Sequence, residues 1–135
     1  MEKRLNIVTQ QFSAALQDFR KALELDLSQF DPGVVDVIKN GQVQKYEFTV
    51  ELLWKMLKVF LYEQHGTDAA SPKQTIRTYF ELGFCEYQDA EQMLEAVDMR
   101  NRLSHVYKKE IFEEILSHIK KYKDLFDRVF QNKPW

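Results

Sequence analysis

The densest run of chemically able side chains in this sequence is Met-Arg-Asn-Arg-Leu-Ser-His-Val-Tyr at residues 99–107. Two of its members, Arg100 and His105, are of the types that act on a phosphate. A guanidinium group matches phosphate oxygens with two parallel hydrogen bonds and stays charged. Histidine titrates near neutral pH and can move a proton to or from a ribose hydroxyl or a leaving oxygen. Such a pair needs no metal ion, and it suits RNA cleavage through the neighbouring 2′-hydroxyl group.

The way these side chains combine depends on whether the run is helical. Residues four apart lie on one face of an α-helix, which pairs Arg100 with Ser104 and Asn101 with His105. Tyr107 returns nearly to the face of Arg100 if the helix continues that far. One face would then offer a cation, a hydroxyl and a phenol, and its neighbour an amide and an imidazole.

A structural interpretation accounts for the same residues without any reaction. A histidine near a helix end is often a cap or a solvated group. Arg100, Asn101 and Arg102 are also typical of a solvated helix face that forms salt bridges, here to Glu91 or Glu95. Spacing alone favours this structural interpretation over a catalytic one.

Other kinds of site have less support. His65 precedes Gly66 at an expected helix end, and His118 lies beside lysines on the polar side of a later helix. The sequence lacks a zinc-ligand spacing, a glycine-rich phosphate loop and the paired aspartates of a nucleotidyltransferase. We therefore expect no metal and no cofactor, and no nucleotidyl transfer by this chain alone. Glu47 and Lys55 are polar residues in an apolar stretch and are candidates to face a site.

Composition narrows the class of protein. A chain of 135 residues is long enough for one domain, residues 1–135, with a single core. A net charge of −2 argues against a protein that is basic throughout or a polybasic membrane anchor. We expect no signal peptide, and we find no apolar run long enough to span a bilayer. The one cysteine, Cys85, is consistent with a reducing compartment, so we expect a cytoplasmic protein.

The elements that must position residues 99–107 are helices, because apolar residues recur every three or four positions along the chain. This pattern predicts an all-α fold, namely an up-and-down antiparallel four-helix bundle with one or two additional short helices. The second long helix is apolar over much of its circumference, so we expect it at the centre of the bundle and expect a homodimer. The helices are expected at about 3–25, 42–65, 71–82, from 88 or 89 to between 104 and 107, and 109–131.

Residues that start or stop helices set the expected boundaries. Asp31-Pro32 predicts the start of a short segment, which Asn40-Gly41 should interrupt or kink. Gly66 should end the second long helix, and Ser71-Pro72 should open the next, with Gln74 able to complete a capping box. The aromatic residues of the central helix are expected in the core: Tyr46, Phe48, Trp54, Phe60 and Tyr62.

Two stretches taken together resemble a known family. They are Gln-Val-Gln-Lys-Tyr-Glu-Phe-Thr-Val-Glu-Leu-Leu-Trp-Lys-Met-Leu-Lys at residues 42–58 and Arg-Asn-Arg-Leu-Ser-His-Val-Tyr at residues 100–107. They are similar to the nucleotidyltransferase substrate-binding proteins of the HEPN superfamily. Ser71-Pro72, Arg77 and Gly83 also stand where that family has them. The resemblance covers roughly residues 40–130 and includes the Arg-x4-His-x-Tyr motif of one subgroup.

The resemblance implies a single HEPN-like helical domain, usually a homodimer, bound to a separately encoded minimal nucleotidyltransferase. Many HEPN proteins with Arg-x4-His are metal-independent endoribonucleases and act as toxins of two-gene toxin–antitoxin modules. In the subgroup with the tyrosine, the partner transferase neutralises the toxin by adding AMP to it. A second function stays open, in which the chain is a non-catalytic subunit that presents a nucleotide, RNA or small-molecule substrate to the transferase.

Residue by residue, the resemblance makes Arg100 and His105 the catalytic pair, Asn101 a polar helper and Tyr107 the modification site, in a site built from both copies of the dimer. The family often has an acidic residue after the tyrosine, whereas Lys108-Lys109 follow here. The change either weakens the cap of the last helix or adds positive charge that suits RNA. Candidate supporting residues are Glu47, Lys55 and Ser104.

Overall fold

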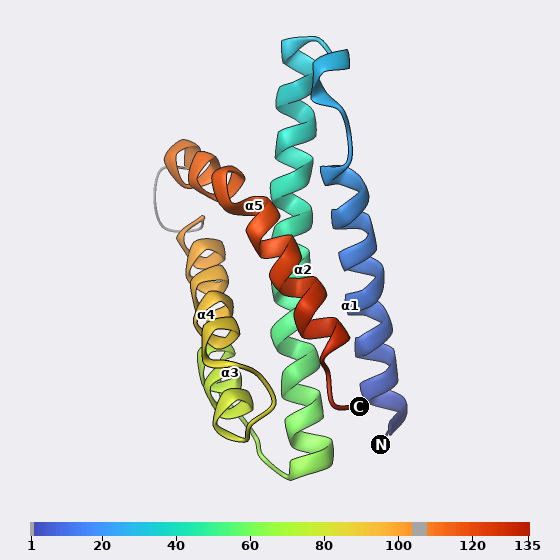
Figure 1. Ribbon diagram of the computed structural model, residues 1–135, viewed down its shortest axis with the longest axis vertical. Helices are drawn as coiled ribbons and strands as arrows, with labels where there is room; N and C mark the ends of the chain where they lie inside the picture. The colour runs from blue at the N-terminus through green and yellow to red at the C-terminus, as the bar shows by residue number, and fades with distance from the viewer. Residues whose placement is uncertain (1, 104–107) are drawn as a thin grey trace.

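The computed structural model describes residues 2–103 and 108–135, and it contains no β-strand in these ranges. Its elements are α1 (Glu2–Leu23), the 3-10 helix η1 (Leu27–Gln29), α2 (Pro32–His65), α3 (Pro72–Glu81), α4 (Tyr87–Arg102) and α5 (Lys108–Gln131). Figure 1 shows α2 between α1 on one side and α3 and α4 on the other, with α5 crossing α2 at an angle. The two termini lie at the same end of the bundle (Figure 1). The all-helical bundle expected from the sequence is confirmed, and none of the helices described is long and apolar enough to cross a membrane.

The long helix α2 is the central element, because it packs against α1, α3, α4 and α5. Its 34 residues make it about 51 Å long. The expected interruption at Asn40-Gly41 was wrong, since α2 is continuous from Pro32. A glycine inside a helix costs only about 1 kcal/mol. Burial of the next two residues, Gln42 and Val43, offsets that cost, and Gln42 Nε2 also donates to the carbonyl oxygen of Ala22 at 3.0 Å.

The predicted helix boundaries at Gly66 and at Ser71-Pro72 are confirmed. Gly66 has a φ of 64°, and its N–H donates to the carbonyl oxygen of Tyr62 at 3.1 Å. Glycine adopts this left-handed conformation without strain, so it ends α2. The hydroxyl of Ser71 accepts from the N–H of Gln74 at 3.1 Å and caps α3. The Gln74 side chain accepts from the N–H of Ala70 at 2.8 Å, one residue before the position that a capping box uses.

The core is organised around Tyr46 of α2, which is completely buried. Its ring centroid lies 5.2 Å from that of Tyr122 and 6.2 Å from that of Phe126, both on α5. On the α1 side, the ring of Phe19 lies 6.3 Å away. The Tyr46 hydroxyl donates to the carbonyl oxygen of Ala96 on α4 at 2.6 Å. Burial raises the pKa of Tyr46 well above its ordinary value, so this hydroxyl keeps its proton and the bond persists across the physiological pH range.

Two aromatic residues of α2 lie outside the core, contrary to expectation. Tyr46 and Phe60 are buried and Trp54 is partly buried, but Phe48 and Tyr62 are 59% and 53% exposed. Helical periodicity predicts apolar faces, but it does not separate a face packed within the chain from one left open. Phe48 and Tyr62 are 14 positions apart and therefore lie within about 40° of each other around α2.

We expect Tyr46→Phe to lower the free energy of unfolding by about 1–2 kcal/mol. The substitution keeps the ring packing and removes only a buried hydrogen bond between α2 and α4. Urea denaturation followed by circular dichroism measures the change. Tyr62→Phe, at an exposed position of the same helix, is the control and should fall within about 0.5 kcal/mol of the unsubstituted protein. Equal effects of the two substitutions would contradict this role for Tyr46.

Candidate functional site

The predicted motif lies at the end of α4, and the structure describes its first part. Arg100 and Asn101 belong to the last turn of α4, while Ser104, His105 and Tyr107 lie outside the described residues. Among the described residues α4 ends at Arg102, and the expected end at residues 104–107 lies outside them. The N–H of Leu103 donates to the carbonyl oxygen of Arg100, three residues back, at 3.3 Å, which tightens the turn that follows the helix.

The side chain of Arg100 is directed toward α2. Its Nε lies 3.5 Å from Oε2 of Glu51, and the two side chains are 33% and 32% exposed. The Nε atom itself is buried and has no hydrogen-bond partner among the described residues. The charged group of Arg100 is thus attached to the central helix along one edge, and part of it stays in contact with solvent.

Glu51 contacts two more side chains, both from its own helix. The indole N–H of Trp54 donates to Glu51 Oε2 at 3.2 Å, and the Lys55 ammonium lies 3.5 Å from Glu51 Oε1. Glu51 is not among the site residues predicted from the sequence. The signal was present, because Glu51 is one helical turn from both Glu47 and Lys55, the polar residues already noted in this apolar helix. Lys55, predicted as a supporting residue, is linked to Arg100 through Glu51, and its supporting role stays a prediction.

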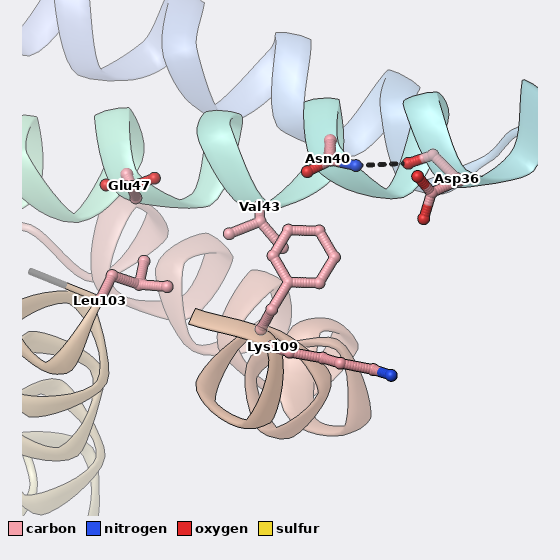
Figure 2. Close-up of a pocket in the computed structure, with 7 residues that line it drawn as sticks. Asp36, Asn40, Val43, Glu47, Leu103 and Lys109 are labelled. Atoms are coloured by element: carbon pink, nitrogen blue, oxygen red, sulfur yellow. Dashed lines mark hydrogen bonds between the residues drawn. The ribbon is translucent and has the colours of Figure 1, made fainter. Parts of the chain in front are cut away.

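A cleft lies between α2 and the first turns of α5, next to the seam where α4 packs against α2. Its volume is about 530 Å³, and Figure 2 shows residues of α2 on one side of it and Leu103 on another. Glu47 lines the cleft one helical turn before Glu51, and Leu103 lines it three residues after Arg100. Arg100 and Glu51 are not lining residues, so the ion pair lies about one turn beyond the cleft along α2. The lining residues are Asp36, Asn40, Val43, Glu47, Leu103, Lys109 and Phe112.

The remaining residues of the motif differ in their contacts. Asn101 is exposed. Arg102 Nη1 lies 3.4 Å from Glu114 Oε2 on α5. The salt bridges of the two arginines therefore go to α2 and α5, and not to Glu91 or Glu95 as the structural interpretation expected. Glu95 instead accepts from the Tyr122 hydroxyl at 2.7 Å, and this hydrogen bond lowers the pKa of Glu95. Together the contacts of the two arginines join the end of α4 to α2 and α5.

The other titratable candidates lie away from this seam. His65 ends α2, and its ring centroid is 5.1 Å from that of Phe60 and 4.9 Å from that of Phe84. His118 is exposed on α5. Within residues 2–103 and 108–135, no three histidine, cysteine or carboxylate side chains are grouped so that they could hold a metal ion. Cys85 is half-buried, and burial raises the pKa of its thiol to about 11, which disfavours a nucleophilic thiolate.

Comparison with known protein families gives one match, and it covers nearly the whole chain. Residues 8–133 match the family described as nucleotidyltransferase substrate binding protein like. The chain belongs to this family. The match agrees with the resemblance seen in residues 42–58 and 100–107, and it extends that resemblance into α1.

A solved structure supports the family fold. A protein from the bacterium Thermus thermophilus is similar to this chain with a TM-score of 0.76 and 28% sequence identity. The similarity covers 89% of this chain and 96% of the Thermus chain. No curated protein matches the chain significantly.

We expect Arg100→Ala to change the free energy of unfolding by less than about 1 kcal/mol. A salt bridge whose partners are one-third exposed contributes little to stability, because water already solvates both charges. Met99→Ala is the matched comparison on the same turn. Met99 is buried, and truncating a buried methionine costs roughly 2 kcal/mol or more. A large loss of stability in Arg100→Ala alone, measured by urea denaturation, would make Arg100 a structural residue.

Proposed function

We propose that this protein is the helical partner of a separately encoded minimal nucleotidyltransferase and that Arg100 and His105 make it a metal-independent endoribonuclease. The observation that carries the proposal is the placement of Arg100. Its guanidinium is held at the α2–α4 seam and is partly open to solvent, and a cleft of about 530 Å³ is lined by Leu103, three residues after Arg100, and by Glu47, one turn before Glu51. A partly solvated guanidinium suits recognition of a phosphate in a ligand bound nearby. Asn101, next in the chain, is the proposed polar helper.

The proposed reaction is transfer of the phosphodiester within the RNA. The ribose 2′-oxygen attacks the neighbouring phosphorus, an oxygen–phosphorus bond forms, and the bond to the 5′-oxygen of the next nucleotide breaks. The products are a 2′,3′-cyclic phosphate and a 5′-hydroxyl end. Arg100 neutralises the charge that builds on the phosphate oxygens. His105 removes the 2′-hydroxyl proton or supplies a proton to the leaving 5′-oxygen.

Two copies of the chain would supply a histidine for each proton transfer, so we propose that the active form is a homodimer. The exposed aromatic residues of α2 support this proposal. Phe48 and Tyr62 lie on the same side of the central helix as Lys55, which is linked to Arg100 through Glu51. Pairing of this side with a second copy would bury both rings and bring the two motifs near each other. We place the dimer in the cytoplasm, where RNA is available.

We expect the purified protein to cleave single-stranded RNA in the presence of EDTA and to leave 2′,3′-cyclic phosphate ends. Arg100→Ala and His105→Ala should each lower the cleavage rate about 100-fold or more, because each removes a group that acts only in the transition state. Gel electrophoresis of a labelled oligonucleotide measures the rate, and mass spectrometry identifies the ends.

His118→Ala is the control, since this exposed histidine of α5 lies outside the seam. It should cleave at the rate of the unsubstituted protein. If the unsubstituted protein and His105→Ala cleave equally poorly, the ribonuclease proposal is wrong.

The family description favours a second candidate function. In it, the chain is a non-catalytic subunit that presents a substrate to the transferase, and the cleft with Glu47, Asp36 and Asn40 at its wall would hold that substrate. Co-purification with the transferase, together with a nucleotide bound in the cleft and no cleavage of RNA, would establish this function in place of the first.

We further propose that the transferase regulates the ribonuclease at Tyr107. The tyrosine oxygen attacks the α-phosphorus of ATP, a new oxygen–phosphorus bond attaches AMP, pyrophosphate leaves, and the phenol proton passes to a base of the transferase. Incubation with the transferase, ATP and Mg²⁺ should add one AMP unit per chain and abolish cleavage of RNA. Tyr107→Phe should gain no AMP, and the control Tyr87→Phe, at an exposed tyrosine of α4, should gain it normally. AMP found on Tyr87, or on neither tyrosine, would contradict the assignment.

A further inference from the structure

The side chain of Arg100 is anchored to α2 along one edge only. The contact to Glu51 is made through Nε, at 3.5 Å, and this buried nitrogen has no hydrogen bond among the described residues. Buried polar groups normally have a partner, and the Glu51 carboxylate is the acceptor that the described residues place beside Nε. Hydrogen bonds at functional sites are often long in the absence of ligand and shorten when it binds.

Glu51 is itself held in place by two neighbours. The Trp54 indole donates to Oε2, the oxygen that faces Arg100, and Lys55 lies near Oε1. All three residues belong to the second half of α2, which the core fixes through Leu53, Met56 and Leu57, each completely buried. The Glu51 carboxylate is therefore held on the central helix of the fold, whereas Arg100 lies in the last turn of α4.

Because the guanidinium is planar, a contact along one edge is enough to orient the whole group. Fixing its Nε edge sets the plane of the group and leaves the two terminal nitrogens to donate in parallel to two oxygens of a phosphate. The cluster formed by Arg100, Lys55 and Glu51 also attracts anions. Arg100 and Lys55 contribute two positive charges and Glu51 one negative charge, which leaves a net +1 among these three residues.

We propose that Glu51 is the positioning residue for Arg100: it orients the guanidinium so that its terminal nitrogens meet the scissile phosphate. This inference rests on the proposed ribonuclease function. Glu51 touches neither the phosphate nor the moving protons, and it acts only through Arg100. Glu51 lies within residues 42–58, one of the stretches that carry the resemblance, but no role was predicted for it, and it lies 49 positions before Arg100 in the chain.

Steady-state cleavage of an RNA oligonucleotide by Glu51→Gln and Glu51→Ala tests the proposal. We expect Glu51→Ala to lower kcat about 10- to 100-fold, because a misplaced catalytic group loses its alignment in the transition state. KM should change less than about threefold, since much of the binding contact with RNA lies elsewhere. Glu51→Gln keeps an oxygen that can accept from Nε, so it should recover much of the lost rate.

The pH profile separates positioning from direct catalysis. If Glu51 only orients Arg100, the rate of Glu51→Gln falls by one factor at every pH and the shape of the profile is unchanged. A lost or displaced limb would make Glu51 an acid–base group and overturn the proposal. Glu81→Gln, at an exposed residue near the end of α3, is the charge-matched control and should match the unsubstituted protein.

A structural role for Glu51 is tested by thermal unfolding. The melting temperature of each Glu51 variant should stay within roughly 5 °C of the unsubstituted protein, because the pair is one-third exposed. The proposal is overturned if Glu51→Ala cleaves at the normal rate, cleaves faster, or loses activity only in proportion to lost folded protein.

A magnetic-resonance measurement keeps this test separate from that of the ribonuclease itself. The Nε–H signal of Arg100, assigned by its absence in Arg100→Lys, should be protected from exchange in the unsubstituted protein and in Glu51→Gln. It should lose protection in Glu51→Ala. If the unsubstituted protein cleaves no RNA, the proposed function fails by the cleavage assay. The positioning of Arg100 is then decided by this signal, and an Nε–H that ignores Glu51 overturns it.

Discussion

The hydrogen bond from the Tyr46 hydroxyl to the Ala96 carbonyl oxygen is the contact on which the arrangement of the seam depends. It joins the middle of α2 to α4 inside a dry aromatic cluster, where a mismatched donor or acceptor is costly. Ala96 is one helical turn before Arg100, and Glu51 is little more than one turn after Tyr46. Once this bond sets the register of α4 against α2, the arginine is brought beside the carboxylate.

The seam therefore divides into a structural part and a chemical part that follow each other along the same two helices. The structural part is buried, neutral and aromatic. The chemical part is charged and about one-third exposed, and its salt bridge contributes little to folding. Because the Arg100–Glu51 pair adds little to the free energy of folding, stability does not account for it. We therefore look for its function in the orientation that Glu51 gives to Arg100.

Much of the fold followed from local signals. Gly66 and Ser71 ended and began helices as expected, because a left-handed turn and an N-terminal cap depend on one or two residues. The predicted interruption at Asn40-Gly41 was wrong, because a glycine lowers helix stability only slightly and the burial of Gln42 and Val43 outweighs that loss. The prediction that Phe48 and Tyr62 lie in the core was also wrong, because helical spacing shows which residues share a face but not what covers that face.

The sequence by itself determined the helices, the central place of the apolar α2, the family resemblance and the residues of the motif, since each depends on residue types and short spacings. Only the tertiary structure brought Glu51 to Arg100, because a contact between residues 49 positions apart depends on the packing of two helices. The same packing decided that Arg102 pairs with Glu114 on α5 and that Glu47 lines a cleft. Helix periodicity orients a side chain around its own axis, and the register between helices is set by the buried core.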